Sequence, residues 1–511
     1  MRPIDLQRDL KLPQPQADTR LAVCPILLAV LHDFHRMRIS YCYWKSSRTV
    51  DAVLAGEGDL DLLIAREDQH RCQAILLARG LKLFPMVASR DHPAMLSFLG
   101  LDDLTGRLVH IHLHFRLVAG ERLLKNYSLP WQEVILARAI RHPDYPIRIL
   151  DPASEALLLM IRSALELRRR DPVTLRHWAA TTAKFASDRA ELEGRVERSA
   201  LHDLAAQLLG EDLALRLVAA FFGDEPLHRQ RALRRDLAHS LAPYRTYNAI
   251  EARLRATIRA GLWAAGGLNR QHVHWPRPSA RRAPGGGSVI AIIGVDGSGK
   301  STVVAAVRDW LGSEIDTLPM YFGTGDGRPL LLMRPFKALL PLFSRLLRTR
   351  PKGSSHGKIS EQRPGLGYQI LLAGWAVVVA REKRSKLLAA HRGARRGLVV
   401  LTDRYPQNEI IGFNDGPLLH RLPWAPRWLR GIETSAYALA RRLAPDLVVK
   451  LQVSPETAQA REPTMDPSVI RDRIEAIQHL NFAAHRIVTI DAELPLAEVI
   501  RKIKLEVWRL L

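Results

Sequence analysis

The first part of the chain alternates short apolar runs with amphipathic stretches. LDLLIA (60–65) predicts a strand, and residues 68–79 predict a helix that ends at Gly80. LVHIHLHF (108–115) alternates apolar and polar residues with the period of two that is typical of a half-buried strand. These elements predict an α+β or α/β domain over residues 1–145.

The middle of the chain, residues 146–274, lacks strand-like runs and places apolar residues at helical spacing, as in SEALLLMIRSALELRRR. Asp151 before Pro152 has the form of an N-cap followed by a first-turn proline, which predicts where the first helix begins. We expect a helical domain whose interspersed arginines form a solvated face. Residues 275–287, WPRPSARRAPGGG, have the composition of a linker.

Strand and helix patterns alternate from residue 288 to residue 511. VIAIIG (289–294) is a buried-strand run, and GLVVLTD, DLVVKLQV and RIVTID are further strand candidates. The alternation predicts an α/β domain with a parallel sheet covered by helices on both faces. The apolar stretch Gly367–Ala380, followed by REKRSK, has two interpretations: a helix on an anionic membrane, or a core helix whose basic end emerges into solvent.

The charge balance is strongly basic, with 75 Lys and Arg against 52 Asp and Glu and a formal net charge of +23. Such an excess favours polyanionic partners, although scattered basic residues also fit an arginine-rich surface. The segment 335–352, PFKALLPLFSRLLRTRPK, is basic and amphipathic, which indicates peripheral contact with a membrane. We expect no nucleic-acid partner, because aromatic residues make up 6% of the chain and no recognition motif is present.

The cysteines Cys24, Cys42 and Cys72 form no CxxC pair, which argues for a reducing compartment and against a disulfide framework or a zinc site. The first residues, MRPIDLQRDLKLPQPQ, lack a signal-peptide core. The longest apolar run falls short of the roughly 20 residues that a spanning helix needs. We therefore expect a cytoplasmic protein, with attachment to the inner face of the membrane as an alternative.

GVDGSGKST (294–302) matches the phosphate-binding pattern G-x-x-x-x-G-K-[ST] between an apolar strand and an amphipathic helix. The glycines allow backbone N–H groups to converge on phosphate oxygens, and the helix N-terminus adds positive potential. The lysine reaches the β- and γ-phosphates of ATP, and the serine hydroxyl ligates Mg²⁺. The expected nucleotide-binding residues are Gly294, Asp296, Gly297, Ser298, Gly299, Lys300, Ser301 and Thr302.

This loop, followed downstream by Asp403-Arg404-Tyr405, resembles the thymidylate kinases over residues 288–511. The resemblance implies transfer of the γ-phosphoryl group of ATP to a small monophosphate, with dTMP as the default acceptor and a homodimer as one arrangement. It places Asp403 near Mg²⁺ and the phosphates and gives Arg404 the acceptor phosphate.

The same resemblance implies two further site residues. Asp296, inside the loop, matches the acidic residue that faces the acceptor sugar. KLQVSPETAQARE (450–462) is similar to a strand and lid helix of these kinases, so that Arg461 would cap the transferring phosphoryl group. Lys300, Mg²⁺ on Ser301 and both arginines then supply the positive charge that phosphoryl transfer needs.

Two stretches of the kinase-like region depart from the housekeeping enzyme. A long basic insert spans residues 325–366, and the continuation YPQNEIIGFNDGPLL (405–419) resembles thymidylate-kinase-like proteins found with bacterial surface-polysaccharide genes. Three other functions therefore stay open: a kinase of a sugar or glycan intermediate, a nucleotide-binding regulator or scaffold with little catalysis, and a nucleotidyltransferase whose kinase domain makes its substrate.

The N-terminal region contains Lys45-Ser46-Ser47 and, after it, Asp59-Leu60-Asp61, and resembles nucleotidyltransferase-like proteins of the polymerase-β class over residues 40–120. Carboxylates at i and i+2 of a strand share a face and can hold a divalent metal beside a triphosphate. The class usually adds a third carboxylate, but the matching strand carries only histidines. The alternatives are a degenerate domain, metal-ligating histidines, or a polar strand face. The histidines are His110, His112 and His114.

Overall fold

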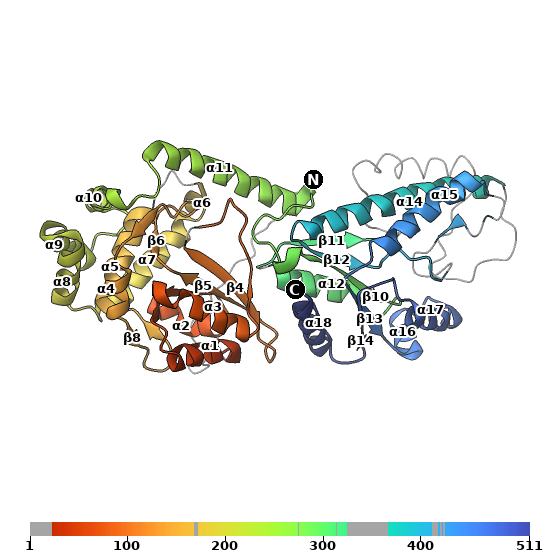
Figure 1. Cartoon of the computed structure of the whole chain (residues 1–511), viewed down its shortest axis with the longest axis horizontal. Helices are drawn as coiled ribbons and strands as arrows, with labels where there is room; N and C mark the ends of the chain where they lie inside the picture. The colour runs from red at the N-terminus through yellow and green to blue at the C-terminus, as the bar shows by residue number, and fades with distance from the viewer. Residues whose placement is uncertain are drawn as a thin grey trace.

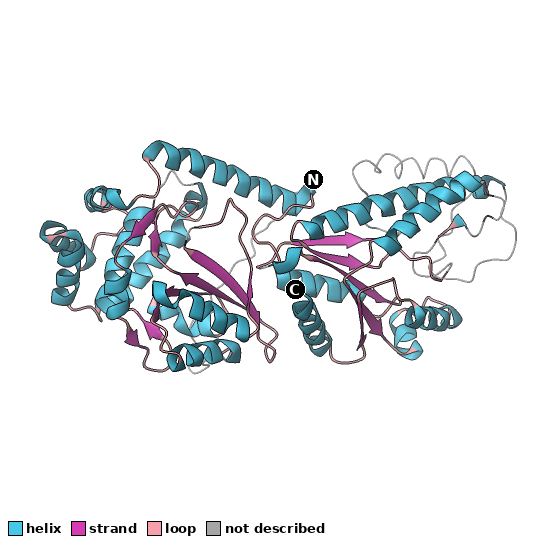
Figure 2. Cartoon of the chain, in the orientation of Figure 1, coloured by secondary structure: helices cyan, strands magenta, loops and turns pink. Residues whose placement is uncertain are grey.

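The computed structural model describes residues 23–92, 94–167, 172–273, 275–312, 314–323, 366–410, 417–419, 422 and 425–511. The described chain is a mixed α/β protein with two large sheets, each flanked by helices (Figure 2). The basic segment expected at 335–352 lies outside the described residues, as do residues 411–416 of the stretch after Asp403-Arg404-Tyr405.

The first sheet contains both strands predicted near the N-terminus. Strand β2 (Asp59–Ile64) pairs in parallel with β5 (Leu108–His114), and α3 (Gln69–Ala78) fits the predicted helix. The other elements around this sheet are α1 (Pro25–Arg36), β1 (Tyr41–Tyr43), α2 (Val50–Leu54), β3 (Lys82–Leu83), β4 (Met95–Leu101), β6 (Leu117–Ala119), β7 (Tyr127–Leu129), α4 (Gln132–Ala137), β8 (Ile140–Arg141) and β9 (Arg148–Ile149). The spatial order is β3-β4-β5-β2-β1-β9-β8.

The prediction that 108–115 is a half-buried strand was wrong in one respect. From Val109 to His114 every residue of β5 is buried, on the polar face as well as on the apolar face. β5 lies inside the sheet between β2 and β4, and its histidines contact the acidic residues of β2 rather than water. The alternation of apolar and polar residues in β5 therefore corresponds to an apolar core on one face and to buried aspartate partners on the other.

The middle region is helical, as predicted, and Asp151 caps its first helix by accepting hydrogen bonds from the backbone N–H groups of Ala153 and Ser154. Its buried residues join one hydrophobic cluster with residues of the first sheet region, such as Leu129 and Trp131. The helices are α5 (Pro152–Glu166), α6 (Pro172–Arg176), α7 (Trp178–Glu193), α8 (Arg198–Leu209), α9 (Glu211–Phe221), α10 (Arg231–Ser240) and α11 (Ala249–Leu268).

The second sheet is parallel throughout and has the order β11-β12-β10-β13-β14. Helices α14 and α15 cover one face, and α12 and α18 cover the other (Figure 1). The four predicted strands are present, and β11 is an additional edge strand. The elements are β10 (Ser288–Gly294), α12 (Lys300–Gly312), β11 (Thr317–Tyr321), α14 (Leu366–Arg395), β12 (Val399–Asp403), α15 (Arg427–Arg442), β13 (Leu447–Gln452), α16 (Pro455–Arg461), α17 (Pro467–His479), β14 (Arg486–Asp491) and α18 (Leu496–Leu510).

The apolar stretch 367–380 begins α14, where Leu372 and Ala376 pack in a small cluster with Leu429 of α15, and the later part of α14 packs on the second sheet. The core-helix interpretation is thus confirmed for the helix as a whole. The expectation that its basic end emerges into solvent was right for Arg381 and Arg384, which are exposed, and wrong for Lys383 and Lys386, which are buried. Lys383 donates to the Tyr437 hydroxyl at 3.2 Å, and Lys386 pairs with Glu382 at 2.8 Å. Among the helices that the structure describes, none combines the length and apolar character of a membrane crossing.

The two sheets meet at a seam formed by residues far apart in the sequence. Phe84, which follows β3, stacks on Trp508 of α18 with ring centroids 5.9 Å apart, and Lys82 donates to the Trp508 carbonyl at 2.5 Å. Phe84 and Leu99 belong to the same hydrophobic cluster as the strands of the second sheet. Apolar burial therefore joins the two halves of the chain (Figure 1).

Replacing Phe84 by alanine is expected to destabilise the folded chain by about 3–5 kcal/mol, because it leaves a cavity at the seam. Phe84 is fully buried. Thermal unfolding followed by circular dichroism measures the change as a lower Tm. Leu77→Ala, at an exposed position of α3, is the control and should leave Tm nearly unchanged. Equal Tm values for Phe84→Ala and the unmodified chain would contradict a packed seam.

Candidate functional site

The phosphate-binding loop lies where the strand order of the second sheet changes direction. β10 leads into the loop and lies between β12 and β13; the chain first forms β11 and β12 on one side of β10 and then crosses to β13 and β14 on the other. In open parallel sheets, ligands bind beyond the carboxyl ends of the strands at such a point. Gly294 ends β10, residues 295–299 form the turn, and Lys300, Ser301 and Thr302 begin α12.

Three glycines of this loop have different physical roles. Gly297 and Gly299 have φ values of +81° and +83°, in the left-handed region that glycine adopts without a Cβ penalty. Gly294 is required by close approach, because a Cβ there would collide with Ser298 Oγ and lie 3.2 Å from Leu451 Cβ. Ser298 is itself buried. The backbone can therefore curl tightly enough to surround a phosphate.

Lys300 is buried at the start of α12, with its Nζ donating to the Val295 carbonyl at 2.6 Å and lying 3.6 Å from Asp296 Oδ1. Burial lowers the pKa of Lys300, and the carboxylates of Asp296 and Asp403 oppose that effect. The ammonium is thus held inside the loop, where a phosphate oxygen can take the place of the carbonyl.

Ser301 and Asp403 supply the oxygen pair expected for Mg²⁺. Ser301 is exposed, and its hydroxyl donates to Asp403 Oδ2 at 3.3 Å across the β10–β12 edge. A hydroxyl and a carboxylate at this separation suit a hard cation that keeps several waters and binds phosphates. The donor set therefore fits Mg²⁺ bound together with a triphosphate.

Asp296, inside the loop, is the centre of an ionic cluster. Its Oδ1 accepts from Arg404 at 3.1 Å, and its Oδ2 accepts from Arg473 at 2.6 Å. Arg404 has φ +68°, an uncommon conformation for a non-glycine residue that is often seen at functional sites. Directly after β12, the Arg404 N–H donates to the Ile292 carbonyl of β10 at 3.2 Å, which fixes this turn beside the loop.

The sequence analysis missed Arg473. It lies on α17, and its neighbours in RDRIEA carry no phosphate-binding pattern. The available signal was helical periodicity, since the buried Ile470 and Ile477 fix the inward face of α17. Only the tertiary structure brings this face to Asp296.

Arg461 ends α16, the helix predicted as a lid, and its guanidinium donates to the Gly297 carbonyl at 3.1 Å. Ser454 caps α16 by accepting from the Thr457 N–H. The Arg461 side chain is exposed and touches the loop from outside, so that a small movement of α16 would bring it over a bound phosphate. The structure thus places all the sequence-predicted kinase residues at one loop.

Gly294→Ala is expected to weaken ATP binding at least about tenfold, because the added methyl displaces Ser298 and reopens the loop that positions the phosphate-binding amides. Isothermal titration with an ATP analogue and Mg²⁺ measures the loss. Gly312→Ala, at the other end of α12, meets no atom within 4 Å and serves as the matched control. Unchanged affinity in Gly294→Ala would show that the loop tolerates a side chain there.

The N-terminal carboxylate pair lies opposite the three histidines of β5. The parallel register sets Asp59 beside His110 and Asp61 beside His112. His110 Nδ1 is 2.5 Å from Asp59 Oδ1, while Asp61 Oδ1 is 3.3 Å from His112 Nδ1 and 2.8 Å from His114 Nε2. We call these five residues the Asp/His cluster.

Electrostatics around this cluster favour charged aspartates and lower the pKa values of His110 and His114. Burial alone would raise the pKa of Asp61, but Lys45 and the imidazoles outweigh it and hold that pKa well below its ordinary value. Burial lowers the pKa of His114 to about 4 and that of Lys45 to about 7, although Asp61 opposes both shifts. Lys45 Nζ lies 3.8 Å from the Trp44 ring centroid.

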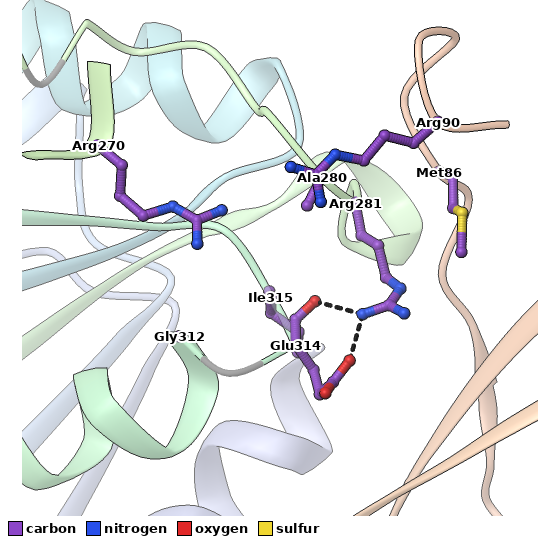
Figure 3. Close-up of a pocket in the computed structure, with 8 residues that line it drawn as sticks. All are labelled: Met86, Arg90, Arg270, Ala280, Arg281, Gly312, Glu314 and Ile315. Carbon is purple, nitrogen blue, oxygen red and sulfur yellow. Dashed lines mark hydrogen bonds and ion pairs between the residues drawn. The ribbon is translucent and has the colours of Figure 1, made fainter. Parts of the chain in front are cut away.

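Arg281, in the stretch predicted as a linker, connects the two halves of the chain. Its guanidinium donates to the Glu314 carbonyl at 2.9 Å and lies 3.0 Å from His110 Nε2, and it also pairs with the Glu314 carboxylate. A cavity of about 100 Å³ lies beside it (Figure 3). This cavity is separate from the phosphate-binding loop, since none of the residues that line it belongs to the loop. They are Met86, Arg90, Arg270, Ala280, Arg281, Gly312, Glu314 and Ile315.

Comparison with known proteins gives no match to a protein-family profile. Two proteins of Escherichia coli (strain K12) are similar to part of the chain, and both are named as uncharacterized ATP-binding proteins. YghR is 28% identical over 235 residues, which are 44% of this chain and 87% of YghR. YghS is 30% identical over 219 residues, which are 42% of this chain and 89% of YghS. The chain therefore belongs to the family of YghS, the uncharacterized ATP-binding protein.

Proposed function

We propose that this chain is an ATP- and Mg²⁺-dependent phosphotransferase whose acceptor is a small molecule that already carries a phosphate. The observation that carries the proposal is the convergence of cations on one loop. Lys300 lies inside the loop, Arg461 contacts it from the lid, and Arg404 and Arg473 flank it through Asp296. Membership in a family named for ATP binding supports the nucleotide half of the proposal.

The cations divide between the two substrates. Lys300 and the loop amides face the position of the ATP phosphates, and Ser301 with Asp403 would hold Mg²⁺. Bound there, Mg²⁺ would offset the negative charge of the triphosphate. Arg404 and Arg473 lie on the Asp296 side, where a second phosphate would replace the carboxylate as their partner. A loop that only bound ATP would not need this second group of arginines.

The proposed step is a direct transfer. An oxygen of the acceptor phosphate attacks the γ-phosphorus of ATP, the bond to the β–γ bridging oxygen breaks, and ADP leaves with that electron pair. The protein contributes position and charge rather than a covalent intermediate. Arg461 would close on the transferring group by exchanging the Gly297 carbonyl for a phosphate oxygen.

The default acceptor is dTMP, which rests on the resemblance of the Asp296 and Asp403-Arg404 motifs to the thymidylate kinases. The test is to incubate the full chain with γ-labelled ATP, Mg²⁺ and a panel of nucleoside monophosphates and sugar phosphates. Label on one acceptor, lost in Lys300→Ala, supports the proposal, and label on dTMP supports the default. Label on a sugar phosphate instead would change the acceptor class. Label only in free phosphate, or ATP binding without turnover, would overturn phosphotransfer in favour of a nucleotide-binding regulator.

A further inference from the structure

We propose that the Asp/His cluster binds one divalent transition-metal ion and prefers Zn²⁺ to Mg²⁺. This proposal is independent of the phosphotransferase function, because it concerns different residues on a different sheet. The side chains of the cluster differ from those of the polymerase-β class, which holds Mg²⁺ with carboxylates. The position beside Asp61 on the neighbouring strand, where the third carboxylate would lie, is His112.

The spacing of the ligand atoms suits a metal ion around His112. Two groups of ligand atoms, one from Asp59, His110 and His112 and one from Asp61, His112 and His114, each lie within 4.8 Å of one another. Two ligands of a tetrahedral zinc ion, each about 2.1 Å from it, are about 3.4 Å apart. The distance from His112 Nδ1 to Asp61 Oδ1 is 3.3 Å, so this pair already has the separation of two ligands.

The chemistry of the donors selects the metal. Imidazole nitrogens suit zinc, iron, nickel and copper, whereas Mg²⁺ prefers an oxygen octahedron and retains its waters. The cluster offers three imidazoles and two carboxylates, and the two aspartates provide the negative charge that a dication would neutralise. The three cysteines are buried elsewhere and are not ligands of this cluster.

The burial of the cluster leaves one side accessible. His114 is fully buried and the His112 side chain is 11% exposed, while the Asp59 side chain is 47% exposed and provides an entry path. His112 Nε2 and His114 Nδ1 are buried and, within the described part of the chain, have no hydrogen-bond partner. The tautomer of each ring is therefore set by the nitrogen that faces Asp61, which donates to this carboxylate without a metal and would present its lone pair to a metal ion once its proton has moved to the far nitrogen.

His110 has the support that metal-ligating histidines usually have. Its Nδ1 faces Asp59, and its Nε2 lies 2.8 Å from the hydroxyl of the buried Ser97. The Ser97 hydroxyl orients the ring and can accept from Nε2 when Nδ1 binds a metal. Without a metal, the Arg281 guanidinium at Nε2 and the Asp59 carboxylate at Nδ1 favour the tautomer with the proton on Nδ1, and Arg281 keeps Glu314 as its partner when the proton moves to Nε2.

The alternative is that aspartates and imidazoles only satisfy one another, with protons where the metal would lie. The two states differ in a measurable way, because a metal ion would take the lone pair of each imidazole nitrogen that faces an aspartate, and the single proton of that neutral ring would move to its far nitrogen. Zn²⁺ binding to the cluster should therefore stabilise the folded chain against unfolding.

The experiment uses the untagged full chain, stripped with EDTA and free of nucleotide. Isothermal titration with ZnCl₂ and, separately, MgCl₂ is expected to show one equivalent of Zn²⁺ bound at least about 100-fold more tightly than Mg²⁺. Co²⁺ should give visible d–d absorption that Zn²⁺ abolishes. Lys300→Ala should bind Zn²⁺ as the unmodified chain does, which separates this site from the ATP site.

His112→Ala and the nearly isosteric Asp61→Asn are expected to lose Zn²⁺ affinity at least about 100-fold, more than loss of a supporting residue costs. His142→Gln, a partly exposed histidine outside the cluster, is the matched control and should bind normally. If His112→Ala fails to fold, Asp61→Asn decides through the loss of the Zn²⁺-induced rise in Tm. No stoichiometric Zn²⁺, Zn²⁺ binding that both variants retain, or tighter binding of Mg²⁺ would each overturn the proposal.

Discussion

Lys300→Ala is expected to reduce phosphoryl transfer by about 10²–10³-fold, or about 3–4 kcal/mol in activation free energy. Lys300 is buried in the loop, where its Nζ contacts the Val295 carbonyl. Removing it leaves the γ-phosphate without the cation of the loop, and charge that develops in the transition state is then offset only by Mg²⁺ and by the arginine side.

Steady-state kinetics with the acceptor identified by the panel measure this effect, and titration with an ATP analogue separates binding from chemistry. Lys502→Ala is the matched control, since Lys502 is exposed on α18 and pairs only with Glu498 at 3.5 Å. It should leave kcat within about twofold. A Lys300→Ala variant with normal kcat would show that the loop positions phosphate through its backbone alone, and the assignment of Lys300 would be wrong.

The kinase-like half was predicted well because its signals are local. β10, the loop and α12 are contiguous in sequence, and the predicted strand that ends at Asp403 contains the apolar run 398–401. β11 was missed because TLPMY contains Pro319, and a proline in a short run argues against a central strand. The structure resolves the conflict by placing β11 at the edge of the sheet.

The residues that complete both sites lie beyond such local signals. The pairing of Arg473 with Asp296 joins residues 177 positions apart, and that of Arg281 with His110 joins residues 171 positions apart. Periodicity identified the shared face of His110, His112 and His114 but gave the wrong environment, because alternation does not distinguish water from a buried acidic neighbour. The seam at Phe84 was not predicted either, since its partner Trp508 lies in the last helix.

The contacts of Arg281 show that residues 275–287 do more than connect the two halves of the chain. Residues 275–287 have a linker composition, yet Arg281 forms an isolated antiparallel bridge with Met86 and ion pairs with Glu314, just beyond α12. Glu314 follows the C-terminal end of α12, and the phosphate-binding loop precedes its N-terminal end. The Asp/His cluster and the ATP site are thus joined through one arginine and one helix, so that occupancy of each site can be assayed against the other.

Arg404→Ala is expected to lower kcat/KM for the acceptor by about 10- to 100-fold while leaving the KM for ATP within about twofold, because hydrogen bonds to charged groups contribute about 1.5–3 kcal/mol. Arg404 reaches the acceptor side from the left-handed turn after β12. Arg404 donates to Asp296 Oδ1 and Arg473 donates to Asp296 Oδ2, so both guanidinium groups converge on one carboxylate before substrate binds. Arg473→Ala should therefore show the same acceptor-selective loss.

A double-mutant cycle tests whether Asp296 acts by orienting these arginines. Asp296→Asn alone should weaken acceptor use, and combining it with Arg404→Ala should add less than the sum of the single effects, with a coupling of about 0.5–3 kcal/mol. Arg308→Ala removes an exposed arginine of α12 that pairs with Asp309, and it controls for lost positive charge near the loop. Strict additivity would mean that Asp296 contacts the acceptor itself, whereas an equal loss for ATP and acceptor would assign Arg404 and Arg473 to the nucleotide instead.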